Sequence, residues 1–523
     1  MTSPSGPAVI GGAAGKGSRL AAAKARAGGT QGFDPGPLWM RILPSVFTFC
    51  VALAGITVPS YWRDEAATLA AVQRPFGDLV RMLGNVDAVH GAYYLLAWVI
   101  VRIFGTGELA LRLPSAIAMC LAAGFVAALG RRLVSPHAGL AAGVVLIVLP
   151  QIAFYGQDAR SYAMVTTAAA IASYLLVRAL QARPGERRTW WSGYAAAVAL
   201  LGVLNIFGLL LVPANAVTVA LRCRRPAEGQ SRRALALGWL GAAAAGCVLA
   251  SPLLYLGYLQ RGQVSWLKTP DGLTGLGQLV GTRGMQVAAI LIIGGGLIAS
   301  AIAGADRLKA TWPRMLGEVS LPWMILPPAL LLTGSLITPM YTFRYVVFCI
   351  PAVALLIGAG IAALGRIAGT AAFIALAVLS FSAQVQIREP GGHRDDIRQA
   401  DQIVAANRRP GDTVLYTNPN AQSFGAAYPY GLGRLRNIAL AQPAIPSGTL
   451  AGTDASYPVI RHRLGTVSRL WVININKNSA VTYRGRPILA GLHLGQVFTW
   501  RTSDIWLRLY VRQGGPAAAH SRR

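Results

Sequence analysis

The sequence predicts a polytopic all-α membrane protein that ends in a small α/β domain outside the bilayer. Of its 523 residues, 54% are hydrophobic and only 13% are charged, whereas soluble globular proteins have about 25% charged residues. Apolar runs near the length of a membrane span recur along the chain, and the mean hydropathy is +0.48. From Arg388 onward the composition turns polar, and short strand-like segments replace the long apolar runs.

The formal net charge of +29 by itself fits a nucleic-acid-binding protein. In membrane proteins, however, lysine and arginine collect in cytoplasmic loops, and this accounts for much of the excess. We therefore expect no nucleic-acid partner. The five cysteines show no metal-ligand spacing, and the sequence contains no haem, iron–sulfur or zinc motif, so we expect no metal and no cofactor.

The first apolar run, residues 40–60, predicts a membrane span that follows a disordered basic tail at residues 1–39. The run starts too late and is too long for a cleavable signal peptide. Asp64 and Glu65 follow the span, and an ionisable pair at a membrane boundary predicts a functional site, although most acidic pairs only cap a surface helix. The cations that predict a cytoplasmic N-terminus, and so an outward-facing acidic pair, are Lys16, Arg19, Lys24 and Arg26.

The topology after this point depends on the run from Ala92 to Phe104. At about 13 residues, with Arg102 inside it, the run is short for a span of about 20 residues. If it lies along the outer interface as a juxtamembrane helix instead, every basic cluster that follows becomes cytoplasmic, so we adopt this arrangement. These clusters are Arg131-Arg132, Arg183 to Arg188, Arg222 to Arg233, Arg307 to Lys309 and Arg366.

A transmembrane module is expected to fill residues 40–386 with about eleven spans. Residues 190–221 lie between two basic clusters, so they must form two short helices that turn outside near Asn205. An odd number of spans places the C-terminus on the outer side of the membrane. We expect this membrane to be the plasma membrane. Besides the first span and this pair, the spans are expected at 111–130, 137–154, 160–180, 234–256, 286–304, 320–338, 343–363 and 367–386.

Residues 388–513 are expected to form the extracytoplasmic α/β domain, and residues 514–523 a disordered tail. The segment from His393 to Arg398 opens a polar helix. The strand-like segments are Thr413 to Tyr416, Arg469 to Asn474 and Ile505 to Val511.

The predicted topology brings carboxylates, amides, guanidinium groups and aromatic rings to the outer face of the membrane. Aromatic rings stack on pyranose faces, amides and acids bind hydroxyls, and arginines hold phosphate oxygens, so this set suits a sugar carried on a phosphate. The candidate site residues are Asp64, Glu65, Asp87, His90, Tyr93, Asp158, Arg160, Tyr162, Asn205, Gln260, Gln263, Trp266, Arg344 and Tyr345.

Each kind of residue also has an ordinary structural explanation. Tyrosines and tryptophans at membrane boundaries are commonly belt residues. A single His90 is about as often a hydrogen-bonded structural histidine, and Asp158 and Arg160 could pair with each other. Arg344 is the hardest to explain in this way, because it lies between two apolar runs with no acidic neighbour in sequence. It requires an anionic partner from elsewhere, either protein or ligand.

The order and common sidedness of several motifs resemble a known family. The motifs are Asp64-Glu65 after the first span, Asp87 to Tyr94, Glu108 to Ser115, Gln157 to Tyr162 and Pro339 to Tyr345. Over roughly residues 40–386 the chain resembles the GT-C class of integral-membrane glycosyltransferases, which use polyprenyl-phosphate sugars. It is most similar to the protein O-mannosyltransferase and aminoarabinose-transferase-like group and its actinobacterial mannosyltransferase relatives. Gly91-Ala92 replaces the usual Pro-Pro, and Asn205 stands where a histidine often precedes an aromatic residue.

The resemblance implies that Asp64 is the catalytic base, that Glu65 supports it, and that Arg160 and Arg344 contact the donor phosphate. Because a polyprenyl phosphate is a good leaving group, the reaction needs cationic stabilisation of the departing phosphate and one base for the acceptor hydroxyl. A single displacement inverts the anomeric centre. The adjacent Asp-Glu pair differs from the Asp-x-Asp motif of metal-dependent relatives, so a metal ion is not indicated. The residues implied to line the sugar or acceptor site are Asp87, His90, Gln260, Gln263 and Trp266.

We therefore expect a metal-independent glycosyltransferase that moves a sugar, above all mannose, from a polyprenyl-phosphate donor. The acceptor is expected to be an extracytoplasmic glycolipid, polysaccharide or protein. Two alternatives stay open. A transporter or flippase would need charged groups near the bilayer midplane and usually internal repeats. A structural envelope protein would bind wall polymer through residues 388–513 and use the bundle as an anchor, which leaves Arg344 and the Asp64-Glu65 pair unexplained.

Overall fold

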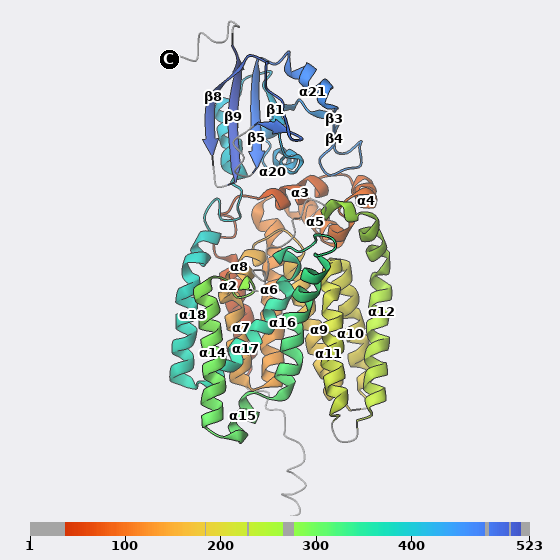
Figure 1. Ribbon diagram of the computed structural model, residues 1–523, viewed down its shortest axis with the longest axis vertical. Helices are drawn as coiled ribbons and strands as arrows, with labels where there is room; N and C mark the ends of the chain where they lie inside the picture. The colour runs from red at the N-terminus through yellow and green to blue at the C-terminus, as the bar shows by residue number, and fades with distance from the viewer. Residues whose placement is uncertain are drawn as a thin grey trace, which may run out of the picture. The chain divides into compact units, whose positions relative to one another are not determined.

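The computed structural model describes residues 37–183, 185–226, 230–264, 277–475, 481–501 and 504–513, which form a helical bundle followed by a strand-containing domain (Figure 1). Most of the two expected tails therefore lies outside the described residues. The bundle helices are α2 (Trp39–Leu53), α3 (Arg63–Val72), α4 (Phe76–Asn85), α5 (Gly91–Phe104), α6 (Glu108–Leu133), α7 (Pro136–Val148), α8 (Pro150–Gly156), α9 (Tyr162–Gln181), α10 (Arg187–Leu204), α11 (Leu211–Arg224), α12 (Arg232–Leu259), α14 (Arg283–Ile302), α15 (Ala305–Thr311), α16 (Arg314–Gly334), α17 (Ile350–Ala363) and α18 (Arg366–Ile387).

Within the described residues, seven helices are long and apolar enough to cross a membrane. They are α6, α9, the segment Ile206–Arg224 that contains α11, and α12, α14, α16 and α18. The pair α7 and α8, bent by 69°, is an eighth candidate, while α2 and α17 belong to shorter apolar helices. The predicted helical membrane fold is confirmed, whereas the count of about eleven spans stays a prediction.

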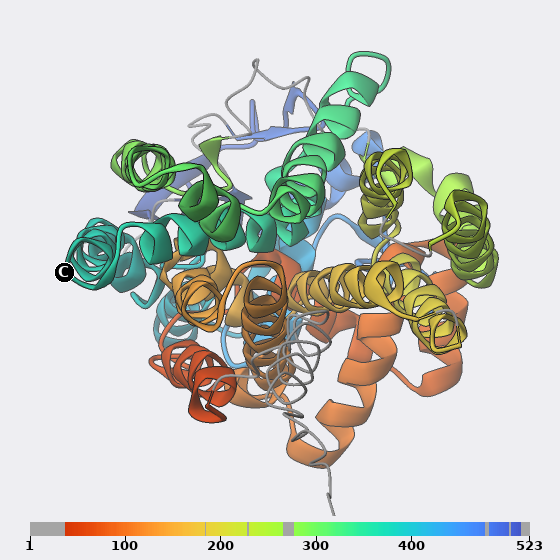
Figure 2. The ribbon, with the colours of Figure 1, turned by 90° about the horizontal axis from the view of Figure 1, so that it is seen from below.

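Small residues let the central helices approach closely. A Cβ atom at Gly139 of α7 would meet the carbonyl oxygen of Ala127 in α6 at 2.4 Å. A Cβ atom at Gly358 of α17 would meet the backbone nitrogen of Ala142 in α7 at 2.5 Å. Close packing of this kind holds membrane helices together. Lipid tails are as apolar as the helix surfaces, so the hydrophobic effect does not drive the helices to associate. Around this centre, α10, α11 and α12 group on one side, and α14 and α18 on the other (Figure 2).

Residues 190–221 form two helices, as predicted. α10 ends at Leu204, a 3-10 turn η2 (Ile206–Leu210) follows, and α11 begins at Leu211. The Oδ1 atom of Asn205 accepts a hydrogen bond from the backbone N–H of Phe207 at 3.0 Å. Because the first N–H groups of a helical turn lack internal partners, Asn205 is used here as a cap.

The run from Ala92 to Phe104 lies in α5, a short apolar helix that packs against α3. The guanidinium of Arg102 donates to the carbonyl oxygen of Arg74 at 2.7 Å, and Trp98 Nε1 donates to the same oxygen at 2.9 Å. α3, α4 and α5 lie together at the end of the bundle that bears the strand domain (Figure 1). This is the place expected for a juxtamembrane helix.

The turns of the bundle separate into two sets at opposite ends. The direction of the helices places the starts of α3 and α9 beside the strand domain, together with Arg344 before α17. The basic turns lie at the other end, and they include Arg131-Arg132, Arg187, Arg224, Arg307 and Arg366. This separation agrees with the topology drawn from the basic clusters, and the compartment that each end faces stays a prediction.

The C-terminal domain contains a five-stranded sheet in the order β2-β1-β5-β9-β8, as expected for a small α/β domain. β1 pairs in parallel with β2 and β5, whereas β9 pairs antiparallel with β5 and β8. Trp471 is fully buried in the sheet, and its Nε1 donates to Asp412 at 2.9 Å. The elements are β1 (Thr413–Tyr416), β2 (Arg436–Asn437), β5 (Arg469–Ile475), β8 (Leu494–Arg501), β9 (Ile505–Arg512), α19 (Ile397–Asn407), α20 (Phe424–Ala427) and α21 (Tyr457–Leu464), with two short hairpins, β3 (Leu440–Gln442) with β4 (Thr453–Asp454) and β6 (Thr482–Tyr483) with β7 (Arg486–Pro487).

Polar contacts join this domain to the starts of α3 and α6. Arg63 donates to both carboxylate oxygens of Asp395, at 2.9 Å from Nε and 2.8 Å from Nη2. Glu108 accepts a hydrogen bond from Arg398 at 2.7 Å. The strand domain therefore rests on the helix whose first turn contains Asp64.

Candidate functional site

Asp64 and Arg344 meet at the end of the bundle beside the strand domain. Asp64 lies in the first turn of α3, and Arg344 lies in the 3-10 turn η4 (Phe343–Tyr345) that precedes α17. Nη1 of Arg344 donates to Oδ2 of Asp64, which makes an ion pair between residues 280 positions apart. The anionic partner that the sequence requires for Arg344 is therefore a residue of the protein itself.

This ion pair forms part of the wall of a cavity of about 320 Å³. Among the described residues, no group of three or more His, Cys, Asp or Glu side chains could hold a metal ion. The strand domain contributes four residues to the wall, which are Pro419, Ser423, Leu450 and Ala451. The predicted site residues that line the cavity are Asp64, Asp87, His90, Arg160, Tyr162, Arg344 and Tyr345.

A chain of hydrogen bonds fixes Arg160 in the cavity wall. The hydroxyl of Tyr94 donates to Oδ2 of Asp87 at 2.8 Å and accepts from Nη1 of Arg160 at 2.9 Å. Arg160 is only 5% exposed, and its Nε has no hydrogen-bond partner within the described residues. A buried cation with a donor still unused suits a phosphate that enters the cavity, because charge-assisted hydrogen bonds are the strong ones.

The charges around Asp64 keep its carboxylate ionised. Burial opposes ionisation, but the charges of Arg344 and Arg160 outweigh it and hold the pKa of Asp64 below its usual range. Burial and the charge of Arg160 lower the pKa of His90 to about 4, so its imidazole is neutral at pH 7. Nδ1 of His90 has no hydrogen-bond partner in the described part of the chain, so it is open to bind a hydroxyl.

Glu65 does not line the cavity, because its side chain is fully buried in the protein. Its carboxylate accepts from Nε and Nη2 of Arg112 at 2.8 and 2.6 Å, and from the backbone N–H of Ala159 at 2.9 Å. Burial opposes its ionisation, but the bidentate Arg112 outweighs this and lowers the pKa of Glu65 to about 2. Glu65 thus ties α3 to α6 and to the loop before α9.

Asp158 and Tyr93 are also buried away from the cavity. Nε1 of Trp62 donates to Oδ1 of Asp158 at 3.0 Å, and the hydroxyl of Tyr93 donates to the carbonyl oxygen of Leu111 at 3.0 Å. Burial and the charge of Glu65 raise the pKa of Asp158 to about 8. Asp158 is therefore mostly protonated at neutral pH, and the described residues include no ion pair between Asp158 and Arg160.

Gln260 holds the loop that contains Asp87 in place at the cavity. Its Oε1 accepts from the backbone N–H of Ala88 at 2.9 Å, and its Nε2 donates to the carbonyl oxygen of Leu83 at 2.9 Å. These bonds fix the loop in which Asp87 adopts a left-handed backbone with φ of 60°. The predicted contacts of Trp266 and of the Gln263 side chain lie outside the described residues.

Sequence reasoning did not select Arg63, which also lines the cavity. It is held by Asp395 and, at 3.2 Å, by Asp504. Its position directly before Asp64 was a usable signal, since a cation beside an acidic pair at a membrane boundary is itself unusual. Ser423 and Leu450 gave no such signal, because only the docking of the strand domain brings their loops to the cavity.

A second cavity, of about 380 Å³, lies next to the first. Tyr155 lines the second cavity and Tyr162 the first, and their rings contact each other edge-on with centroids 5.3 Å apart. Arg394 and Gln151 supply polar groups to the second cavity. This aromatic contact links the walls of the two cavities.

Residues 91–256 match the family described as dolichyl-phosphate-mannose-protein mannosyltransferase. Curated protein sequences give no match. ArnT from Cupriavidus metallidurans, bound to undecaprenyl phosphate, superposes with a TM-score of 0.57 at 14% identity, over 91% of this chain and 99% of ArnT. Its apo structure gives 0.57 at 13% identity, over 90% and 97% of the two chains. At this identity the likeness shows the fold alone, and it confirms the predicted fold.

Proposed function

We propose that the protein is an integral-membrane glycosyltransferase that takes its sugar from a polyprenyl-phosphate donor. The observation that supports this most is one cavity whose wall contains an ionised Asp64 together with Arg160 and Arg344. A base and cations in one space are what transfer of a phosphate-linked sugar to a hydroxyl requires. The match to the family named for dolichyl-phosphate-mannose and the fold shared with ArnT bound to undecaprenyl phosphate support a lipid-linked donor.

In the proposed reaction, Asp64 removes the proton of the acceptor hydroxyl. The acceptor oxygen forms a bond to the anomeric carbon while the bond from that carbon to the phosphate oxygen breaks. The polyprenyl phosphate leaves with the bonding electrons, and Arg160 and Arg344 stabilise its negative charge. A single displacement inverts the anomeric centre, so a β-linked donor gives an α-glycoside, and the step needs no metal ion.

In this reaction, the Asp64–Arg344 ion pair makes the basicity of Asp64 depend on donor binding. With the cavity empty of phosphate, Arg344 keeps Asp64 ionised but also weakens it as a base, because the guanidinium lowers its pKa. A donor phosphate beside Arg344 partly neutralises that charge, and the pKa of Asp64 then rises toward its usual range. Donor binding therefore strengthens the base just where the acceptor hydroxyl arrives.

Mannose is the sugar we propose, and this choice rests on the matching family description rather than on the cavity. The acceptor is proposed to be an extracytoplasmic glycolipid, polysaccharide or protein. The strand domain contributes Ser423 and Leu450 to the cavity wall, which supports a contact between this domain and the acceptor. In this proposal, neutral His90 and the carboxylate of Asp87, which both line the cavity, bind sugar hydroxyls.

The test is turnover by the purified full-length protein supplied with radiolabelled polyprenyl-phosphate mannose and an envelope extract as acceptor. We expect release of polyprenyl phosphate and transfer of label. Arg344→Lys should weaken donor binding by roughly tenfold, since an ammonium does not hold a phosphate bidentately, and Arg344→Ala should be almost inactive. Arg261→Lys, at the same end but outside the cavity, is the matched control.

Two results would count against the proposal. Donor that is bound but never cleaved, with labelled lipid appearing in the opposite leaflet of a vesicle, would favour a transporter or flippase. No donor binding, together with strong binding of wall polymer by the strand domain, would favour an envelope anchor. Equal donor binding by wild type and Arg344→Ala would reassign Arg344 to structure.

A further inference from the structure

A cavity of about 710 Å³ lies at the end of the bundle away from the strand domain. Its lining residues come mainly from the ends of α7, α15, α17 and α18, and none of them lines the candidate active site. The label of α15 marks this end of the bundle in Figure 1. Most of its lining is apolar and comes from membrane helices, including Leu43, Leu140, Val144, Ile361 and Phe373. In a bilayer such a space faces lipid chains rather than bulk water.

The lining changes from polar to apolar along two helices. Residues three and four apart share one helix face, so each helix presents a continuous row to the cavity. On α7 the row is His137, Leu140, Ala141 and Val144, and on α18 it is Arg366, Gly369, Thr370 and Phe373. Each row begins with a cationic or titratable residue in the first turn and ends with a large apolar side chain, so the cavity has a polar mouth and an apolar interior.

The mouth of this cavity has positive character. Neither Arg366 nor His137 makes a side-chain hydrogen bond or ion pair within the described residues, and both are exposed. α18 begins here after Gly365 without a side-chain cap, so its first-turn N–H groups add partial positive charge. At the start of α7, the hydroxyl of Ser135 already accepts a hydrogen bond from the N–H of Ala138 at 3.2 Å. The hydroxyls of Ser135 and Thr370 also line the cavity. The described residues that line this cavity include no acidic side chain, and donors gathered in this way match a phosphate group.

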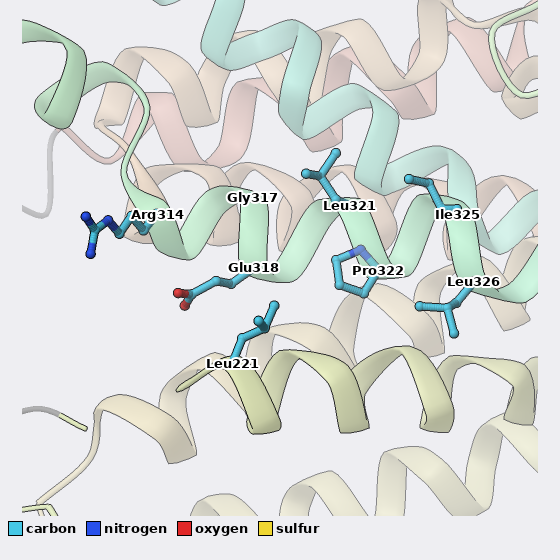
Figure 3. A pocket seen from close by; sticks show the side chains of 8 residues that line it. All are labelled: Leu221, Arg314, Gly317, Glu318, Leu321, Pro322, Ile325 and Leu326. Atoms are coloured by element: carbon cyan, nitrogen blue, oxygen red, sulfur yellow. The ribbon is translucent and has the colours of Figure 1, made fainter. Parts of the chain in front are cut away.

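Another cavity of the bundle provides a contrast. It has about 420 Å³ and lies between α11 and α16, where Leu221, Leu321 and Leu326 line it (Figure 3). α16 begins at Arg314, as α18 begins at Arg366, but Glu318 lies one turn further along α16 and also lines this cavity (Figure 3). A carboxylate at this cavity repels a phosphate, so of these two cavities the larger one is the more complementary to an anion.

We propose that the larger cavity binds one anionic phospholipid. Its phosphate lies at Arg366 and the start of α18, and an acyl chain lies against Leu140, Val144 and Phe373. The lipid comes from the leaflet at the basic end of the bundle, which the sequence predicts to be cytoplasmic. This inference rests on the membrane bundle and is independent of the proposed glycosyl transfer.

Native mass spectrometry of the purified full-length protein in detergent tests the proposal with phosphatidylglycerol, phosphatidylcholine and inorganic phosphate as probes. Wild type should retain one phosphatidylglycerol and bind it at least about tenfold more tightly than phosphatidylcholine. Inorganic phosphate alone should not bind measurably, because it gains nothing from the apolar interior. Arg366→Gln should weaken phosphatidylglycerol binding by roughly tenfold and leave phosphatidylcholine unchanged. Arg314→Gln, which removes the same charge from the first turn of another helix, should change neither.

A second variant keeps the test independent of Arg366. Ala141→Phe fills the interior while leaving the mouth intact, so it should abolish retention of phosphatidylglycerol. Its melting temperature in lipid-free detergent checks that the variant is folded. Equal affinity of wild type for phosphatidylglycerol and phosphatidylcholine would overturn the proposal. So would phosphatidylglycerol affinity that survives both Arg366→Gln and Ala141→Phe in folded protein.

Discussion

Asp64 and Glu65 are consecutive residues, yet their carboxylates lie in different surroundings. Asp64 faces the cavity and pairs with Arg344, whereas Glu65 is sealed in the protein against Arg112. Both residues lie in the first turn of α3, and successive residues of a helix point about 100° apart. One acidic pair therefore supplies a candidate base and a structural ion pair, and the two residues should respond differently to substitution.

Asp64→Asn should lower turnover by roughly 10²-fold or more, because it keeps the shape of the side chain and removes the base. Donor binding should survive or tighten, since Arg344 no longer shares its charge with a carboxylate. Turnover and donor affinity are measured separately on the purified protein. Asp78→Asn, which removes an acid from the first turn of α4, is the control and should leave both unchanged. Near-normal turnover of Asp64→Asn would remove the main support for the proposed reaction.

Glu65→Gln should mainly lower the stability of the folded protein rather than its catalytic activity. Removing one partner of a fully buried ion pair leaves Arg112 uncompensated, which costs about 3–5 kcal/mol. We expect a clear fall in melting temperature, with turnover per folded molecule reduced less than in Asp64→Asn. The double variant Glu65→Gln, Arg112→Met should recover part of the lost stability, because it no longer buries an unpaired charge. If Glu65→Gln melts like wild type but is inactive, the base has been assigned to the wrong acid.

Asp395→Asn should loosen the strand domain at the cavity. Asp395 accepts three hydrogen bonds from Arg63, one from the backbone and two from the guanidinium, and hydrogen bonds to charged groups contribute about 1.5–3 kcal/mol each. We expect the KM for acceptor to rise several-fold while donor affinity changes little, and the strand domain to become easier to cleave by protease. Asp504→Asn, which removes the weaker 3.2 Å contact of a carboxylate that is 33% exposed, should have a smaller effect. Equal effects of the two variants would contradict this role for Asp395.

Asp158 should make stability depend on pH in a definite direction. Its pKa is about 8 in the folded protein, above the ordinary value of 3.8, so the folded state binds a proton that the unfolded state releases. The stability from this proton is fully present below about pH 4 and is lost as pH rises through about 8. Asp158→Asn does not titrate, so its melting temperature should fall less than that of wild type between pH 5 and pH 8. Asp306→Asn, at an exposed site, is the control. Parallel pH profiles of wild type and Asp158→Asn would disprove the assignment.

Much of the candidate site could be predicted because the local composition of the chain indicates its membrane topology. Long apolar runs and basic turns placed Asp64, Arg160 and Arg344 at one end of the bundle, and the cavity contains all three. The same reasoning assigned Asp158 and Gln260 to the site, but Asp158 is buried beside Trp62 and Gln260 holds the loop of Asp87. Topology determines the end of the bundle at which a residue lies. It does not determine whether the side chain points into the cavity or into the packing between elements.

By itself, then, the sequence determined the helical membrane class, the two opposite ends of the bundle, the α/β character of residues 388–513 and most of the polar residues that line the cavity. Hydropathy, charge and turn-forming residues influence the structure of neighbours a few positions away along the chain. Their patterns can therefore be recognised in one sequence. Only the tertiary structure decided that Arg344 pairs with Asp64, that Arg112 pairs with Glu65 and that the strand domain lines the cavity. Those pairings join residues far apart in sequence, and they form because a buried charge must find a partner wherever packing brings one within reach.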